Sequence, residues 1–98
     1  MDIRMERNGN ELMIALTGRL DTLSSPELEE KLEPALEGVE KLVFDFAELK
    51  YISSAGLRVL LTALQIMDEQ GEMKVKNVCA DVMDVFEVTG FVDDLDIE

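Results

Sequence analysis

Strand-like and helix-like segments alternate along most of this chain, and that order restricts the folds open to it. A strand pattern at Lys41–Phe46 is followed by a helical pattern at Ser54–Gln70, a strand at Met73–Val78 and a short helix at Asp81–Val88. Strands joined through a helix cross over in the right-handed sense and pair in parallel, so a parallel sheet is expected here. The length of 98 residues suits a single domain, residues 1–98.

The N-terminal segment predicts an antiparallel hairpin in front of this parallel unit. Apolar residues alternate with polar ones over residues 1–5 and again over 12–16, which is the period of a half-buried strand. The pair Asn8-Gly9 lies between them and favours the positive φ angles of a tight turn. We therefore expect an α/β fold in the order β-β-α-β-α-β-α-β, with a mixed β-sheet and helices packed mainly on one face.

The first helix is expected between Ser25, as its N-cap, and Gly38, as its C-cap. Pro26 suits the first helical position, whereas Pro34 removes one internal hydrogen bond and predicts a kink or an early stop. In each expected helix the apolar residues recur at helical spacing and form one inward face. These residues are Leu28, Leu32 and Leu36 in this helix, Leu57, Leu60, Leu61, Leu64 and Met67 in the next, and Val82, Val85 and Phe86 in the third.

Three further segments complete the predicted fold. Lys41–Phe46 is typical of a strand covered on both faces, apart from Asp45. Ala47–Tyr51 is expected to be a short connection that leads into the second helix at about Ser54. Val92–Ile97 is expected to add a final short strand.

The charge balance is strongly acidic, with 22 acids against 9 bases and a formal net charge of −13. Nucleic acid and anionic lipid bind proteins mainly through Lys and Arg, so we expect neutral or basic protein surfaces as partners, with no nucleic acid and no membrane. No apolar run approaches the roughly 20 residues that span a bilayer, and the N-terminus lacks the features of a signal peptide. A lone cysteine, Cys79, has an apolar context that favours burial, and it fits a reducing, cytoplasmic compartment.

The residues that most enzymatic sites require are missing. The chain has no histidine, so Ser–His and Cys–His nucleophilic pairs and imidazole metal sites are excluded. Its six glycines are scattered near element boundaries and form no phosphate-binding loop. We therefore expect no catalytic residue, metal or cofactor, and the sequence does not predict an enzyme.

Tyr51–Leu61, with the sequence YISSAGLRVLL, places two serines where a loop becomes an apolar helix. In one interpretation Ser53 or Ser54 is only an N-cap that contributes about 1 kcal/mol, and Gly56 is small because a neighbouring element passes close. In the other, one serine is a phosphorylation switch on a protein-binding domain, and Gly56 lets a partner backbone or a kinase active site approach. Glycine costs helix stability relative to alanine, so some requirement other than helix formation favours Gly56.

The same residues carry a resemblance to a known family. The chain resembles the anti-sigma factor antagonists of bacteria, which are members of the STAS domain family. The resemblance rests on Thr17–Asp21 after the second strand, Leu42–Phe46 in the third strand and Tyr51–Leu57 at the start of the second helix. It extends from about residue 3 to residue 92 and implies the STAS fold.

The resemblance implies a partner-switching cycle that regulates transcription. Unphosphorylated members of the family bind an anti-sigma factor that is also a serine kinase, which releases the sigma factor. The kinase phosphorylates a serine of the antagonist and ends this interaction, and a metal-dependent serine phosphatase restores it. Matched position by position, the acceptor is Ser54, with Ser53 as the second candidate. The residues expected to bind the partner are Asp21, Thr22, Ser53, Ser54, Ala55, Gly56, Leu57 and Arg58.

Two departures from the family pattern and two other functions stay open. Many members carry Asp immediately before the acceptor, where this chain has Ser53, and the family often adds a last helix where only about eight residues follow Gly90. One alternative function is a non-phosphorylated STAS interaction module, a scaffold or transport-assembly subunit in which Ser54 is only a cap. Another is a small-ligand binding domain that uses the loops near Asp21 and Ser54. A monomer is expected in each case.

Overall fold

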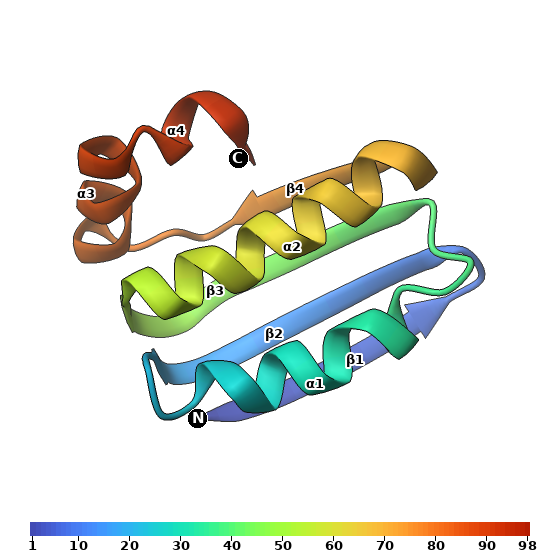
Figure 1. The fold of residues 1–98 in the computed structure, drawn as a ribbon, viewed down its shortest axis with the longest axis horizontal. Coiled ribbons are helices and arrows are strands. Elements are labelled where there is room, and N and C mark those ends of the chain that lie inside the picture. The colour runs from blue at the N-terminus through green and yellow to red at the C-terminus, as the bar shows by residue number, and fades with distance from the viewer.

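A computed structural model describes all residues, 1–98, as one five-stranded sheet with four helices (Figure 1). The strands lie in the order β1-β2-β3-β4-β5; β1 and β2 pair antiparallel, and every later pair is parallel. The predicted α/β class and mixed sheet are therefore confirmed. The elements are β1 (Asp2–Asn8), β2 (Glu11–Leu20), α1 (Ser25–Ala35), β3 (Lys41–Ile52), α2 (Ser54–Gln70), β4 (Glu72–Lys76), α3 (Ala80–Thr89), α4 (Phe91–Asp94) and β5 (Asp96–Ile97).

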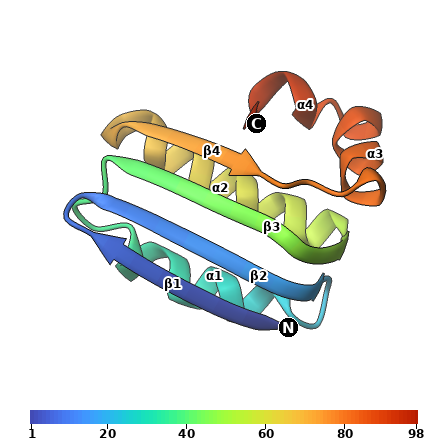
Figure 2. The same ribbon diagram turned by 180° about the vertical axis from the view of Figure 1, so that it is seen from behind.

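The helices α1 and α2 lie side by side across one face of the sheet, and the opposite face carries no helix (Figure 1 and Figure 2). Burial therefore alternates along β3. Leu42, Phe44 and Phe46 are fully buried beneath the helices, whereas Val43 and Asp45 on the open face are only half-buried. The prediction that this strand is covered on both faces is wrong, because no second helix layer exists.

A single apolar core of 23 buried residues lies between the sheet and the helices. The inward stripe of α1 is as predicted, since Leu28, Leu32 and Leu36 are all buried. In α2, however, Leu61 is 37% exposed. The small residues Gly56 and Ala63 are buried on the sheet side of the helix instead. Because their side chains are small, the helix backbone can lie close to the sheet. The helix is thereby turned so that Leu61 points outward, and Leu64 is only half-buried.

Several predicted element ends are corrected by the structure. β3 continues to Ile52 and pairs with β2 through two register shifts, so Ala47–Tyr51 is strand and not a connection. The hairpin turn has a positive φ at Gly9 (67°) but not at Asn8. The C-terminal segment forms the short helix α4 before β5, a two-residue strand parallel to β4. None of the four helices combines the length and the apolar character that a bilayer crossing requires.

The first helix begins and ends differently from the prediction. Its N-cap is Ser24, and Ser25 is the first helical residue, 3% exposed, with no hydrogen-bond partner for its hydroxyl. The C-cap is Leu36, and Gly38 follows in a turn with φ of 75°. The early stop expected from Pro34 is confirmed, because the helix ends at the next residue.

Candidate functional site

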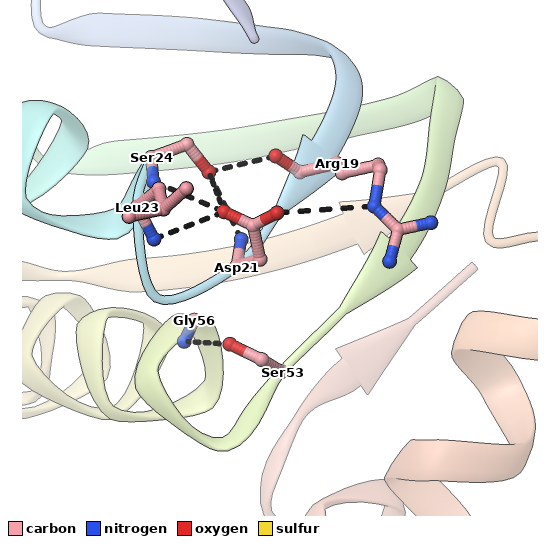
Figure 3. Close-up of polar contacts among 6 residues, drawn as sticks. All are labelled: Arg19, Asp21, Leu23, Ser24, Ser53 and Gly56. Carbon is pink, nitrogen blue, oxygen red and sulfur yellow. Dashed lines mark hydrogen bonds and ion pairs between the residues drawn. The ribbon is translucent and has the colours of Figure 1, made fainter.

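The predicted site residues meet at one edge of the sheet because β2 and β3 are parallel neighbours that end together. Leu20 pairs with Ile52 at this end, and the backbone N–H of Ser53 donates to the carbonyl of Leu20 at 2.9 Å. Each strand then leads into a helix, so the turn before α1 and the first turn of α2 lie next to each other (Figure 3). The topology therefore brings Asp21 and the two serines into one region.

The two serines have different environments. Ser53 is the N-cap of α2, with φ of −99° and ψ of 176°, and its hydroxyl accepts the backbone N–H of Gly56 at 3.4 Å (Figure 3). Its side chain is half-buried. Ser54 is the first helical residue, it is exposed, and its hydroxyl forms no hydrogen bond within the protein. Of the two serines, only Ser54 has an exposed hydroxyl that is free of hydrogen bonds within the protein.

Gly56 lies in the interior, directly beneath the serines. A Cβ atom at this position would lie 2.8 Å from side-chain carbons of both Ile52 and Leu20, and 2.9 Å from the Leu20 carbonyl oxygen. The glycine is therefore required by a neighbouring element of the same chain, as the first interpretation of the motif held. Leu57 is also buried, with 6% of its surface exposed, so these two residues of the expected binding set lie beneath the protein surface and offer little area to a partner.

Asp21 is fixed by its own turn. Its carboxylate accepts the backbone N–H groups of Leu23 and Ser24, each at 3.1 Å, and the Ser24 hydroxyl accepts the backbone N–H of Asp21 at 2.9 Å (Figure 3). These bonds, the Ser24 backbone N–H above all, lower the pKa of Asp21 below its ordinary value. The side chain is 31% exposed, so a fixed negative charge borders the serines at neutral pH.

Arg19 is a site residue that the sequence analysis did not single out. Its Nε lies 3.8 Å from an Asp21 carboxylate oxygen, and its guanidinium carbon lies 4.3 Å from the centroid of the Tyr51 ring. The contact with Tyr51 follows from the β2–β3 register, which pairs the two residues. The sequence feature that could have identified Arg19 as a site residue is its position inside the Thr17–Asp21 motif.

Thr22, Leu23, Ser54 and Arg58 are exposed at this edge, and together with the Asp21 carboxylate we call them the serine face. Arg19 and Tyr51 are exposed beside it. Leu23 was also missed by the sequence analysis, although an isolated leucine in a polar turn is a usable signal. It is 91% exposed, the most exposed of the large apolar side chains. Ala55 lies half-buried behind this face.

The side chains at this edge are hydroxyl, carboxylate, guanidinium and apolar groups. No cluster of three or more His, Cys, Asp or Glu side chains is placed to hold a metal ion. Cys79 is the N-cap residue of α3, and it is half-buried and not fully buried as expected, with its sulfur 3.4 Å from the Leu49 carbonyl oxygen. The serine face offers the hydroxyls of Ser54 and Thr22, the Asp21 carboxylate, the Arg58 guanidinium and the apolar side chain of Leu23.

Comparison with known proteins shows the family to which this chain belongs. The family model described as "Mlab, STAS domain" matches residues 3–96, and the chain therefore belongs to the STAS domain family. BtrV of Bordetella bronchiseptica, which is named as an anti-sigma factor antagonist, is 36% identical over 94 residues that cover 94% of this chain and 81% of BtrV. The anti-sigma-B factor antagonist of Bacillus subtilis is 29% identical over 98 residues, covering 99% of this chain and 90% of that protein.

The fold is also that of a protein of solved structure. SpoIIAA, an anti-sigma factor antagonist, is similar in its unphosphorylated form with a TM-score of 0.78 and 18% identity, covering 99% of this chain and 87% of that one. Its phosphorylated form gives a TM-score of 0.77 and 19% identity, covering 99% and 91%. At such identities the likeness shows the fold alone, and it confirms the STAS fold that the resemblance implied.

Proposed function

We propose that this protein is an anti-sigma factor antagonist that binds an anti-sigma factor serine kinase while Ser54 is unmodified, and thereby regulates transcription by partner switching. The relatives named as anti-sigma factor antagonists support this assignment. The observation that carries it is the free, exposed hydroxyl of Ser54 at the start of α2, beside the fixed Asp21 carboxylate. Such a hydroxyl can enter a kinase active site without any rearrangement of the fold.

Ser54 is the better acceptor of the two serines. The hydroxyl of Ser53 caps α2 through Gly56, and its side chain is half-buried. Phosphorylation of Ser53 would convert the capping hydroxyl oxygen into a phosphate ester at a half-buried position. Ser54 is exposed and is not the cap, so we assign the modification to Ser54 and a capping role to Ser53.

The proposed reaction transfers one phosphoryl group. The bond from the γ-phosphorus of ATP to its bridging oxygen breaks, a bond from that phosphorus to the Ser54 hydroxyl oxygen forms, and ADP leaves. The hydroxyl proton passes to a base of the kinase. A serine phosphatase reverses the state by hydrolysis, which consumes water and releases inorganic phosphate.

The switch follows from charge at the serine face. A phosphate adds about −1.5 to −2 charges at pH 7. At a helix N-terminus it gains about 0.3–2 kcal/mol from the helix dipole, so the domain stays folded. A partner whose contact surface was built for a neutral hydroxyl next to the Asp21 carboxylate now meets a second, larger negative charge. Each 1.4 kcal/mol of repulsion lowers the affinity about tenfold.

Phosphorylation assays test this function. The protein is incubated with ATP and an anti-sigma factor serine kinase that binds it, and phosphate incorporation is measured by mass spectrometry. We expect one phosphate on wild-type protein and on Ser53→Ala, and none on Ser54→Ala. Absence of phosphate from all three proteins would favour the non-phosphorylated interaction module instead.

Binding assays test the switch itself. We expect Ser54→Ala to bind the kinase persistently in the presence of ATP, and Ser54→Asp to bind it at least tenfold more weakly. Equal affinities of these two variants would contradict partner switching, even if phosphate is incorporated.

A further inference from the structure

We propose that Arg58 is an internal ligand of a phosphate on Ser54, so that the modified serine is held by its own helix. The inference rests on the proposed function, because it concerns the phosphorylated form. Ser54 is the first residue of α2, Arg58 lies one helical turn further along, and both side chains are exposed. The two residues are therefore neighbours on the solvent side of the helix.

Helix geometry brings the two side chains together. Residues four apart have Cβ atoms about 5–6 Å from each other. Side chains on a helix lean toward its N-terminus, so the long Arg58 side chain extends back over the turn that carries Ser54. A guanidinium is a planar fork that binds phosphate oxygens through two parallel N–H bonds. A phosphate on Ser54 lies within its reach.

Arg58 has no competing partner in the unmodified protein. It forms no ion pair, and it is the only charged residue of α2 between Ser54 and Met67. The first turn of the helix carries no acidic residue that could occupy the guanidinium. Arg19, the other arginine at this edge, is already engaged by Asp21 and Tyr51. Arg58 is thus the cation that remains free to receive a phosphate.

This pairing gives the switch a second effect. The bond to Arg58 offsets part of the repulsion between the phosphate and the Asp21 carboxylate, which keeps the modified helix in place. It also withdraws Arg58 from the serine face, where it is exposed in the unmodified protein. Phosphorylation therefore adds negative charge to the partner-binding surface and removes a positive charge from it in one step.

The test uses protein made with phosphoserine at position 54 during synthesis, so it does not depend on any kinase. The second pKa of the phosphate, ordinarily about 6, is measured by ³¹P NMR titration in otherwise wild-type protein and in Arg58→Gln. We expect that pKa to be about 0.15–0.4 unit lower when Arg58 is present. The helix N-terminus is common to both proteins, so the difference reports on Arg58.

Two controls define the outcome. Arg58→Lys should retain part of the shift because it keeps the charge, and Arg19→Gln should change the pKa less than Arg58→Gln does. The difference should shrink in 1 M salt, where screening acts over roughly 3 Å. Equal phosphate pKa values in the wild-type and Arg58→Gln proteins would overturn the inference. A failure of kinases to modify Ser54 would instead overturn the proposed function and leave this titration unaffected.

Discussion

Asp21 and Ser24 hold each other through a reciprocal pair of hydrogen bonds. The Ser24 hydroxyl accepts the backbone N–H of Asp21 at 2.9 Å, and the Asp21 carboxylate accepts the backbone N–H of Ser24 at 3.1 Å. The arrangement resembles a capping box, in which each of two residues three apart satisfies the backbone of the other. It fixes the turn that joins β2 to α1, and with it the negative charge of the serine face.

The Asp21 charge should stabilise the fold in a pH-dependent way. Because the pKa of Asp21 is lower in the folded protein than in the unfolded chain, its stabilisation is complete above the ordinary value of about 3.9. It is lost as the pH falls through the lower folded value. We expect Asp21→Asn to be less stable than wild type at pH 7 in urea unfolding, with a gap in the free energy of unfolding that narrows as the pH falls below about 3.9.

The difference in the free energy of unfolding between wild type and Asp21→Asn isolates the contribution of the Asp21 carboxylate. The chain carries 22 acids, and protonation of the others changes wild type and variant alike. Asn can still accept the backbone N–H groups of Leu23 and Ser24, so the gap reports the charge and not the loss of acceptors. A gap that is constant from pH 7 to pH 2.5 would show that the Asp21 charge is not involved.

Alanine substitutions of the two neighbouring serines at the start of α1 should have different effects on the free energy of unfolding. Ser24→Ala removes the hydroxyl that accepts from Asp21 and lies 2.7 Å from the Arg19 carbonyl oxygen, which should cost about 1–2 kcal/mol. Ser25→Ala removes a buried hydroxyl that has no partner, so it should leave stability unchanged or raise it by up to about 1 kcal/mol. Urea unfolding of the two variants measures both effects, and equal losses would refute the assignment.

Gly56→Ala should destabilise the protein even though alanine is the better helix former. Helix propensity alone would raise stability by about 1 kcal/mol. The added methyl group, however, would lie within 2.9 Å of Leu20 and Ile52, an overpacking that typically costs about 1–3 kcal/mol. Thermal unfolding should therefore show a lower Tm, with Gln65→Ala on the exposed side of the same helix as control. A Tm at or above that of wild type would show that the sheet does not approach this closely.

Leu23 should be an anchor for the kinase. Burial of a leucine side chain in an interface contributes about 1.5–3 kcal/mol, so Leu23→Ser should weaken binding about tenfold or more. Val88 is a matched control, since it is 88% exposed but belongs to α3 and lies outside the serine face. Calorimetric titration should show near wild-type affinity for Val88→Ser, and both variants should keep the Tm of wild type. Equal affinity of Leu23→Ser and wild type would remove Leu23 from the interface.

Local sequence signals determined the order and type of the elements. A period of two in β1 and β2 and a period near 3.6 in α1 reflect the direction in which each side chain points, which depends on the backbone alone. The stop of α1 after Pro34 is equally local, because proline lacks the N–H that the next turn requires. The position of two serines at the start of α2 was predicted for the same reason.

Only the tertiary structure decided which residues of the serine motif are accessible. Gly56 and Leu57 are buried because Leu20 and Ile52 at the ends of two parallel strands press against the first turn of α2, and no local pattern encodes that distance. The contact of Arg19 with Tyr51 likewise depends on a β2–β3 register that two bulges shift. Side-chain periodicity is a property of a single segment, whereas exposure is decided by the segments that pack against it.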